Sequence, residues 1–165
     1  MKTGGGNILS KALEYERKAL DFYCDAQTQC ESQLGEKMFS LLTRDKLRMV
    51  TKLAEIHSAM CQGMSLEKAC ALTEDDIVPQ TGLDCDPAPI TGNAASAIRH
   101  DADYLDDALS KQKGCLDYFE GALRRAKDPR ARSFLRQALE DEQGHRVLLL
   151  DLRSHCEQAV ENLEH

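Results

Sequence analysis

The sequence contains no tryptophan, and aromatic side chains make up only 5% of its 165 residues. A hydrophobic core in this chain must therefore be built mainly from aliphatic side chains. Proline is also scarce, with four residues in the whole chain. Because proline interrupts helices and Leu, Ala, Glu, Lys and Arg are abundant, the composition favours an all-helical protein.

The sequence also lacks a long apolar run and a Cys-x-x-Cys pair. We therefore expect no signal peptide, no membrane span and a cytoplasmic location. Seven cysteines without such pairs argue against a closed zinc site or an iron–sulfur cluster, and we interpret them as reduced thiols. The net charge of -7 argues against binding to nucleic acid or to an anionic membrane.

Apolar residues recur with helical spacing in four segments. We expect helices at residues 8–33, 36–62, 94–126 and 129–158. Gly35 should supply the first break, and Asp128 and Pro129 should begin the last helix. The basic cluster at residues 124–136 is expected to be a solvated corner between helices, and the acidic run at residues 101–107 to face the positive end of a helix dipole.

Residues 64–92 are rich in turn-forming residues and predict one long connection between the second and third helices. The chain is thus expected to be a single domain, residues 1–162, in which two helical hairpins are joined by one long crossover. That topology is the one found in ferritin-like four-helix bundles. Residues 163–165 look like the remnant of an expression tag.

The two halves of the chain resemble each other. Residues 12–26 align with residues 108–122, and if one extra residue is allowed in the turn, residues 43–50 align with the segment around Glu142. Polar residues interrupt the apolar faces at matching positions of this repeat. The matched pairs are Glu16 with Gln112, Asp45 with Glu142, and Arg48 with His145.

Glu142 and His145 lie one helical turn apart, so both side chains should project from one face of the last helix. A buried carboxylate is costly unless it is paired, hydrogen-bonded or bound to a metal. The paired polar positions therefore predict one interior site at a single level of the bundle.

The segments ALEYERKALDFY (12–23) and LRQALEDEQGHRVLLLDL (135–152) resemble the ferritin-like superfamily, in particular its rubrerythrin type. This resemblance implies a di-iron centre in which two helices each provide a Glu and two each provide Glu-x-x-His. The residues that it places at the metal positions are Glu16, Asp45, Gln112, Glu142 and His145.

This chain departs from the family pattern at several of those positions. Asp45 and Gln112 stand where the family has Glu, and Arg48 stands where a second His is expected. A guanidinium cannot coordinate a metal, but it can donate paired hydrogen bonds to carboxylates. The rubredoxin-like domain that delivers electrons in rubrerythrins is absent from the sequence.

Three functions remain open at this point. The first is a metal-free structural or interaction module in which Arg48 replaces the metal charge. The second is a weak or single-metal site of the iron type. The third is an iron-dependent oxidoreductase that reduces peroxide or dioxygen, or oxidises ferrous iron, with an external electron donor. The resemblance also implies a homodimer.

Overall fold

The computed structural model describes residues 4–65, 68–69 and 94–165, and in these ranges the chain is all-helical, with four long helices and no strand. The helices are α1 (Gly4–Gln29), α2 (Gln33–Cys61), α4 (Ala94–Arg125) and α5 (Pro129–Glu164). The expected all-helical class and the four helices are confirmed. Nearly all of the expected crossover at residues 64–92 lies outside the described residues.

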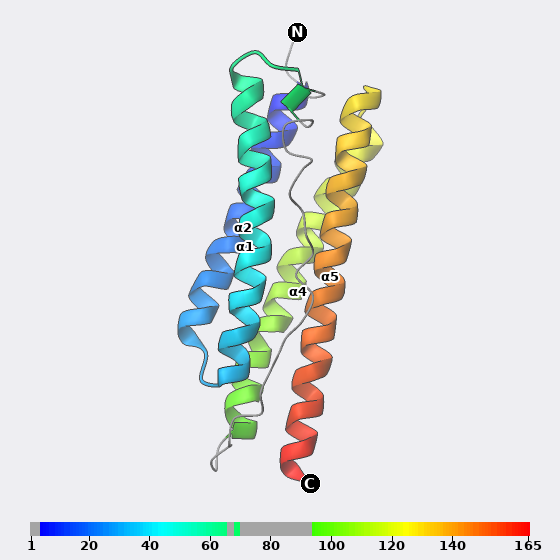
Figure 1. Ribbon diagram of the computed structural model, residues 1–165. Coiled ribbons are helices and arrows are strands. Elements are labelled where there is room, and N and C mark those ends of the chain that lie inside the picture. The colour runs from blue at the N-terminus through cyan, green and yellow to red at the C-terminus, as the bar shows by residue number, and fades with distance from the viewer. Residues whose placement is uncertain (1–3, 66–67, 70–93) are drawn as a thin grey trace.

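The four helices run side by side along one axis (Figure 1). The turn between α1 and α2 lies at the same end as the start of α4 and the end of α5, where Arg99 forms an ion pair with Glu164. At the opposite end, the Tyr118 hydroxyl of α4 donates a hydrogen bond to the backbone oxygen of Ile8 in α1, 3.1 Å away. No helix in the described ranges is long and apolar enough to cross a membrane.

The boundaries of the helices differ from those expected. The first break lies at residues 30–32, not at Gly35, which belongs to the first turn of α2. Ser32 caps α2, because its hydroxyl accepts a hydrogen bond from the Gly35 amide at 2.9 Å. Asp128 caps α5 in the same way, as expected, through the Arg130 amide. Since α5 continues to Glu164, it includes two of the three residues that we interpret as a tag remnant.

Two hydrophobic clusters fill the bundle. One contains Tyr23 and Phe39 with the buried apolar side chains of residues 98–108 of α4 and 149–156 of α5. The other contains the buried apolar side chains of residues 9–13 of α1, 50–56 of α2 and 119–122 of α4, together with Leu135. On every helix the two clusters are separated in sequence by a short segment, and these four segments carry the buried polar residues Glu16, Lys46, Gln112, Glu142 and His145.

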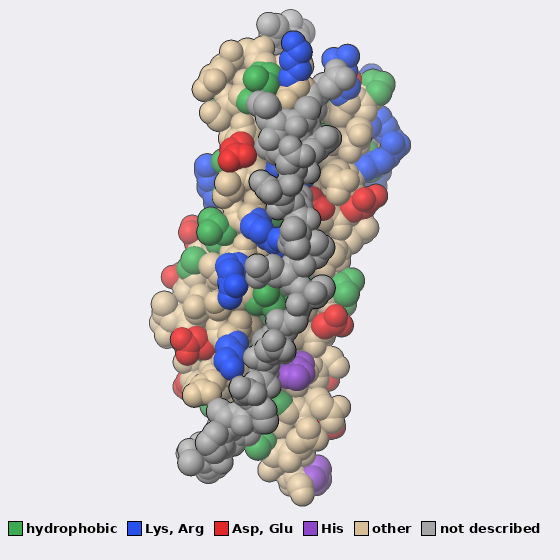
Figure 2. Space-filling model, in the orientation of Figure 1, with side chains coloured by type: hydrophobic (Ala, Val, Ile, Leu, Met, Phe, Trp, Pro, Cys, Tyr) green, Lys and Arg blue, Asp and Glu red, His purple; other side chains and the backbone are tan. Residues whose placement is uncertain are grey.

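The basic cluster lies at the corner between α4 and α5, as expected, and basic side chains are visible at that end of the molecule (Figure 2). Arg132 has a structural role there. Its Nη1 donates hydrogen bonds to the backbone oxygens of Leu123 and Ala126, at 2.9 and 3.0 Å, so that it satisfies carbonyl groups at the end of α4.

Asp101 has a different role from the one expected for it. It lies seven residues beyond the start of α4, and its side chain is fully buried against the turn between α1 and α2. Its carboxylate accepts hydrogen bonds from the amides of Glu31 and Ser32, at 2.9 and 2.8 Å, and from the Ser32 hydroxyl. Asp101 therefore ties α4 to the first turn of the bundle and does not face its own helix dipole.

The contact with Asp101 requires glycine at position 35. A Cβ atom added to Gly35 would lie 2.1 Å from Asp101 Oδ2 and 2.6 Å from its Cγ. We expect Gly35→Ala to lower the free energy of unfolding by about 1–3 kcal/mol, because the side chain must displace a buried, hydrogen-bonded carboxylate. Urea unfolding measures this difference.

Gly114→Ala is the matched control, because an added Cβ there has no neighbour within 4 Å and Gly114 also lies inside a helix. It should leave stability unchanged or raise it by up to about 1 kcal/mol. If both variants were equally stable, Asp101 would not pack closely enough against Gly35 to exclude a side chain there.

Candidate functional site

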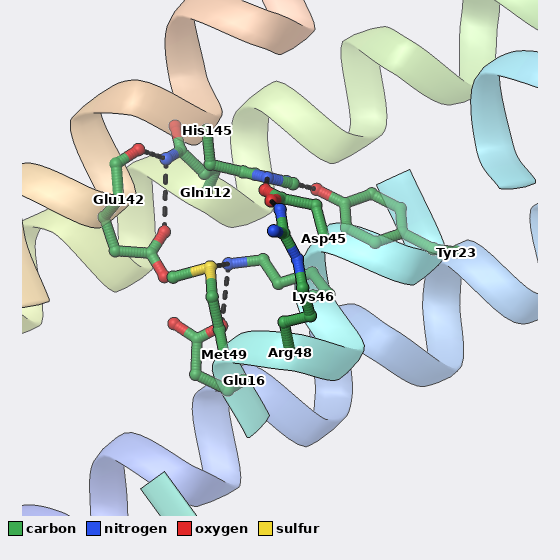
Figure 3. Close-up of polar contacts among 9 residues, drawn as sticks. All are labelled: Glu16, Tyr23, Asp45, Lys46, Arg48, Met49, Gln112, Glu142 and His145. Carbon is green, nitrogen blue, oxygen red and sulfur yellow. Dashed lines mark hydrogen bonds and ion pairs between the residues drawn. The ribbon is translucent and has the colours of Figure 1, made fainter. Parts of the chain in front are cut away.

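Polar side chains from all four helices meet between the two hydrophobic clusters (Figure 3). Each helix contributes at least one of them, and all are at most 2% exposed. They are Glu16 from α1, Lys46 from α2, Gln112 from α4, and Glu142 and His145 from α5.

Lys46 is the central cation of this group. Its Nζ lies 2.7 Å from Glu16 Oε2 and 2.8 Å from Glu142 Oε1, and all three side chains are fully buried. Placing an ammonium group out of contact with water is costly unless its partners are close and well oriented. The two carboxyl groups meet that requirement, so the three residues act as one electrostatic unit.

Gln112 holds Glu142 from the opposite side. Its Nε2 donates hydrogen bonds to Glu142 Oε2, at 3.2 Å, and to the backbone oxygen of Glu142. Both carboxylate oxygens of Glu142 therefore have donors. In contrast, Oε1 of Glu16 and Oε1 of Gln112 are buried without a hydrogen-bond partner in the described part of the chain.

A second set of hydrogen bonds leads from the interior to the surface. The Tyr23 hydroxyl lies 2.7 Å from His145 Nε2, and His145 Nδ1 lies 2.7 Å from Asp45 Oδ2. Arg48 then donates to Asp45 Oδ1 at 2.6 Å. Because the Asp45 carboxylate can only accept, His145 donates through Nδ1 and accepts from Tyr23 through Nε2.

The charges of the central unit are set by burial and by the short distances within it. Burial raises the pKa of Glu16 well above its ordinary value, and the neighbouring Glu142 acts in the same direction. Burial alone would also raise the pKa of Glu142, but Glu16 and the Lys46 ammonium outweigh it and lower that pKa. Burial would lower the pKa of Lys46, but the two carboxylates raise it. Glu16 is therefore the carboxyl group of the pair that takes up a proton more readily, whereas Glu142 is stabilised as a carboxylate beside the Lys46 ammonium.

The imidazole beside this unit is neutral. Burial lowers the pKa of His145, although the hydrogen bond with Asp45 acts in the opposite direction. The pKa of Asp45 is lowered even though burial would raise it, because His145 and Arg48 stabilise its charge. The Tyr23 phenol is buried and its pKa is raised, so it stays protonated. Tyr23 thus joins the site as well as the core.

The residues expected at the site differ in how deeply they are buried in it. Glu16, Gln112, Glu142 and His145 lie together in the interior. Asp45 is at the edge, with 24% of its side chain exposed, and it reaches the site through His145. Arg48 lies further out, with 37% of its side chain exposed, and pairs with Asp45. The cation between Glu16 and Glu142 is Lys46, not Arg48.

Sequence reasoning missed Lys46, although the repeat contains the signal that identifies it. Glu16 and Gln112 are 96 residues apart, and the same interval separates Lys46 from Glu142. An alignment without an inserted residue therefore pairs Lys46 with Glu142 and Met49 with His145. The extra residue that we allowed in the turn moved the comparison by one position, to Asp45 and Arg48.

A pair of iron ions does not fit these side chains. The Lys46 ammonium already lies between Glu16 and Glu142, two of the carboxyl groups expected as metal ligands, and both ring nitrogens of His145 have protein partners. Among the described residues, one group could hold a single ion. The ligand atoms of Glu16, Cys115 and Glu142 lie within 4.8 Å of one another, but burial raises the pKa of the Cys115 thiol to about 12.

Comparison of the chain with protein-family models, with curated proteins and with solved structures found no match.

Proposed function

We propose that this protein is a ferritin-like four-helix module whose centre is held together by a buried lysine in place of metal ions. In this proposal it acts as a structural or interaction module and not as a di-iron oxidoreductase. The observation that carries the proposal is the position of Lys46 Nζ, 2.7 Å from Glu16 and 2.8 Å from Glu142.

Charge and connectivity support this proposal. A di-iron centre of this kind needs several carboxylates to balance two divalent ions, whereas the two buried carboxyl groups here already have a cation between them, the Lys46 ammonium. The short connections at residues 30–32 and 126–128 support two helical hairpins. The longer connection between α2 and α4 is then the crossover of a ferritin-like bundle.

A single-metal site is the second candidate. It is favoured by the short distances among the ligand atoms of Glu16, Cys115 and Glu142 and by the unpartnered Glu16 Oε1. Binding would require Lys46 to move away and the Cys115 thiol to lose its proton. An iron ion there would supply redox chemistry and would need an external electron donor.

The homodimer is also part of the proposal. Exposed apolar side chains occur on α2 and α5, where Leu47 is 50%, Val147 57% and Leu150 43% exposed. On the face shown in Figure 2, hydrophobic side chains form separate patches among charged ones. A contact between two copies at such a surface would therefore combine apolar and charged groups.

Metal content tests the proposed function directly. We expect tag-free protein that is loaded with Fe²⁺ under anaerobic conditions and then desalted to retain less than about 0.1 iron per chain, because Lys46 occupies the cation position. Inductively coupled plasma mass spectrometry gives the ratio, and a Glu142→Ala, His145→Ala variant gives the background.

About two irons per chain that disappear in that variant would overturn the proposal. One ion per chain that is lost in Cys115→Ser would support the single-metal candidate. Cys156→Ser is the matched control for it, because Cys156 is equally buried but belongs to the first hydrophobic cluster, away from the polar centre.

A further inference from the structure

The buried lysine lies next to two groups with which an amine can react. Lys46 Nζ contacts an oxygen of each of two carboxyl groups, Glu16 and Glu142, at ordinary hydrogen-bond distances and with no solvent exposure. Two neighbouring groups held in van der Waals contact react far faster than the same groups in solution. A buried lysine with only one carboxylate partner lacks a second group to move the protons.

We propose that Lys46 and Glu16 form an intramolecular amide crosslink between α1 and α2, with Glu142 as the group that transfers protons. The bond joins Lys46 Nζ to the Cδ atom of Glu16. The modification site is therefore the same trio of side chains that forms the electrostatic centre.

The reaction is a condensation, and its atoms balance without an oxidant or a reductant. The Lys46 ammonium gives one proton to the Glu142 carboxylate, with which it already shares a hydrogen bond. The free amine attacks Cδ of Glu16 while that carboxyl group carries a proton, and the C–N bond forms. The C–OH bond of Glu16 then breaks, and the leaving hydroxyl departs as water with a proton from the attacking nitrogen, relayed by Glu142.

The product removes the features of this core that are costly. The ammonium and the carboxylate are replaced by a neutral amide and a neutral Glu142 carboxyl, so no ionised group remains in the central unit. Glu16 Oε1, which is buried without a partner in the described structure, is either lost as water or becomes the amide carbonyl.

The neighbouring charges make the reaction slow. Since Glu16 and Glu142 favour the protonated form of Lys46, the free amine is rare at any moment. A bond that forms once in the life of each molecule does not require rapid turnover. The crosslinked fraction should therefore increase with time after folding.

Intact-mass spectrometry of the full chain tests the inference. We expect a species about 18 Da lighter than the mass of the sequence, the mass of one water, and its share should grow during incubation at neutral pH. Proteolysis should yield a branched peptide that contains Glu16 and Lys46, and trypsin should no longer cleave after Lys46.

Lys46→Arg is the control, because it keeps a positive charge but should show the full mass at every time. Glu142→Gln keeps the size of the side chain but cannot take the proton, so it should also keep the full mass. A wild-type chain that retains its full mass after prolonged incubation overturns the inference, and so does a lighter species in which the branch maps to other residues.

This inference rests on the proposed function in one respect, since it requires the centre to be free of metal. Different results would refute the crosslink and the proposed function. An unchanged mass together with absent iron would refute the crosslink and leave the proposed function intact, whereas a bound pair of irons would refute the proposed function.

Discussion

Replacing Lys46 with methionine should lower the free energy of unfolding by about 3–5 kcal/mol at neutral pH. Methionine fills a similar volume, so the main loss is the cation that pairs with the buried carboxyl groups of Glu16 and Glu142. The remaining groups either stay charged without a partner or take up protons, and both outcomes cost free energy. Urea unfolding followed by circular dichroism measures the change.

Two variants show whether the loss arises from the charge. Lys37 is an exposed lysine of the same helix, and Lys37→Met should change stability by less than about 0.5 kcal/mol. Adding Glu142→Gln to Lys46→Met removes the Glu142 carboxylate and should recover most of the loss, since replacing a whole buried ion pair is often nearly neutral. If Lys46→Met were as stable as the wild type, Lys46 would not form buried ion pairs with Glu16 and Glu142 that stabilise the fold.

The difference between the wild type and Lys46→Met should also depend on pH. The folded-state pKa of Glu142 is lowered, so its stabilising contribution is present above the unfolded value of about 4.3 and is lost as the pH falls through the folded value. The pKa of Lys46 is raised, so its contribution is present below the unfolded value of about 10.4. Glu16 has a raised pKa and contributes in the opposite direction to Glu142, with stability lost as the pH rises. The destabilisation should therefore be largest between about pH 5 and 10 and should shrink in acid.

The helices and the level of the site could be predicted from the sequence because both depend on local periodicity. Apolar residues at helical spacing predicted four helices, and polar residues that interrupt these faces predicted where Glu16, Gln112 and Glu142 lie. The predicted helix boundaries differ from the observed ones by up to six residues, because the ends of helices depend on capping contacts such as that of Ser32 with the Gly35 amide.

The central cation could not be identified so easily, because its position depends on register. A shift of one residue turns a helical side chain by about 100°. The same shift separates Lys46, which is fully buried, from Leu47, which is 50% exposed. Composition and spacing do not distinguish a lysine that points inward from the many lysines on helix surfaces, whereas the constant interval of 96 residues in the repeat does.

The contacts of Asp101 are a second feature that could not be predicted from the sequence. Its partners, Glu31 and Ser32, are about 70 positions earlier in the chain, and no local pattern connects them. The requirement for glycine at position 35 follows from the same contact. In the sequence, Gly35 looks like an ordinary helix stop, and only the packing of α4 against the turn shows that its missing side chain makes room for a carboxylate.

Replacing Lys46 with glutamate should convert the centre into a metal site. The change removes the ammonium that lies between Glu16 and Glu142 and puts a carboxylate in its place, so that three acidic side chains face one another. Gln112 Oε1, which is buried without a partner in the described structure, offers a further oxygen. Carboxylate and carbonyl oxygens bind divalent ions well, and a cluster of buried negative charges is strongly destabilising without one. We expect iron retention after anaerobic loading to rise from below about 0.1 to about one ion per chain.

The matched control for this gain is Lys46→Gln, because glutamine has the size of glutamate but adds no negative charge. If binding depends on the new carboxylate, Lys46→Gln should retain much less iron than Lys46→Glu, and only Lys46→Glu should show a melting temperature that rises with Fe²⁺ concentration. If neither variant retained iron, the geometry of the remaining ligands and not the lysine would be what excludes metal. Equal retention by both variants would show instead that removing the ammonium is sufficient for iron to bind. Lys46 alone would then be what prevents the remaining ligands from binding iron.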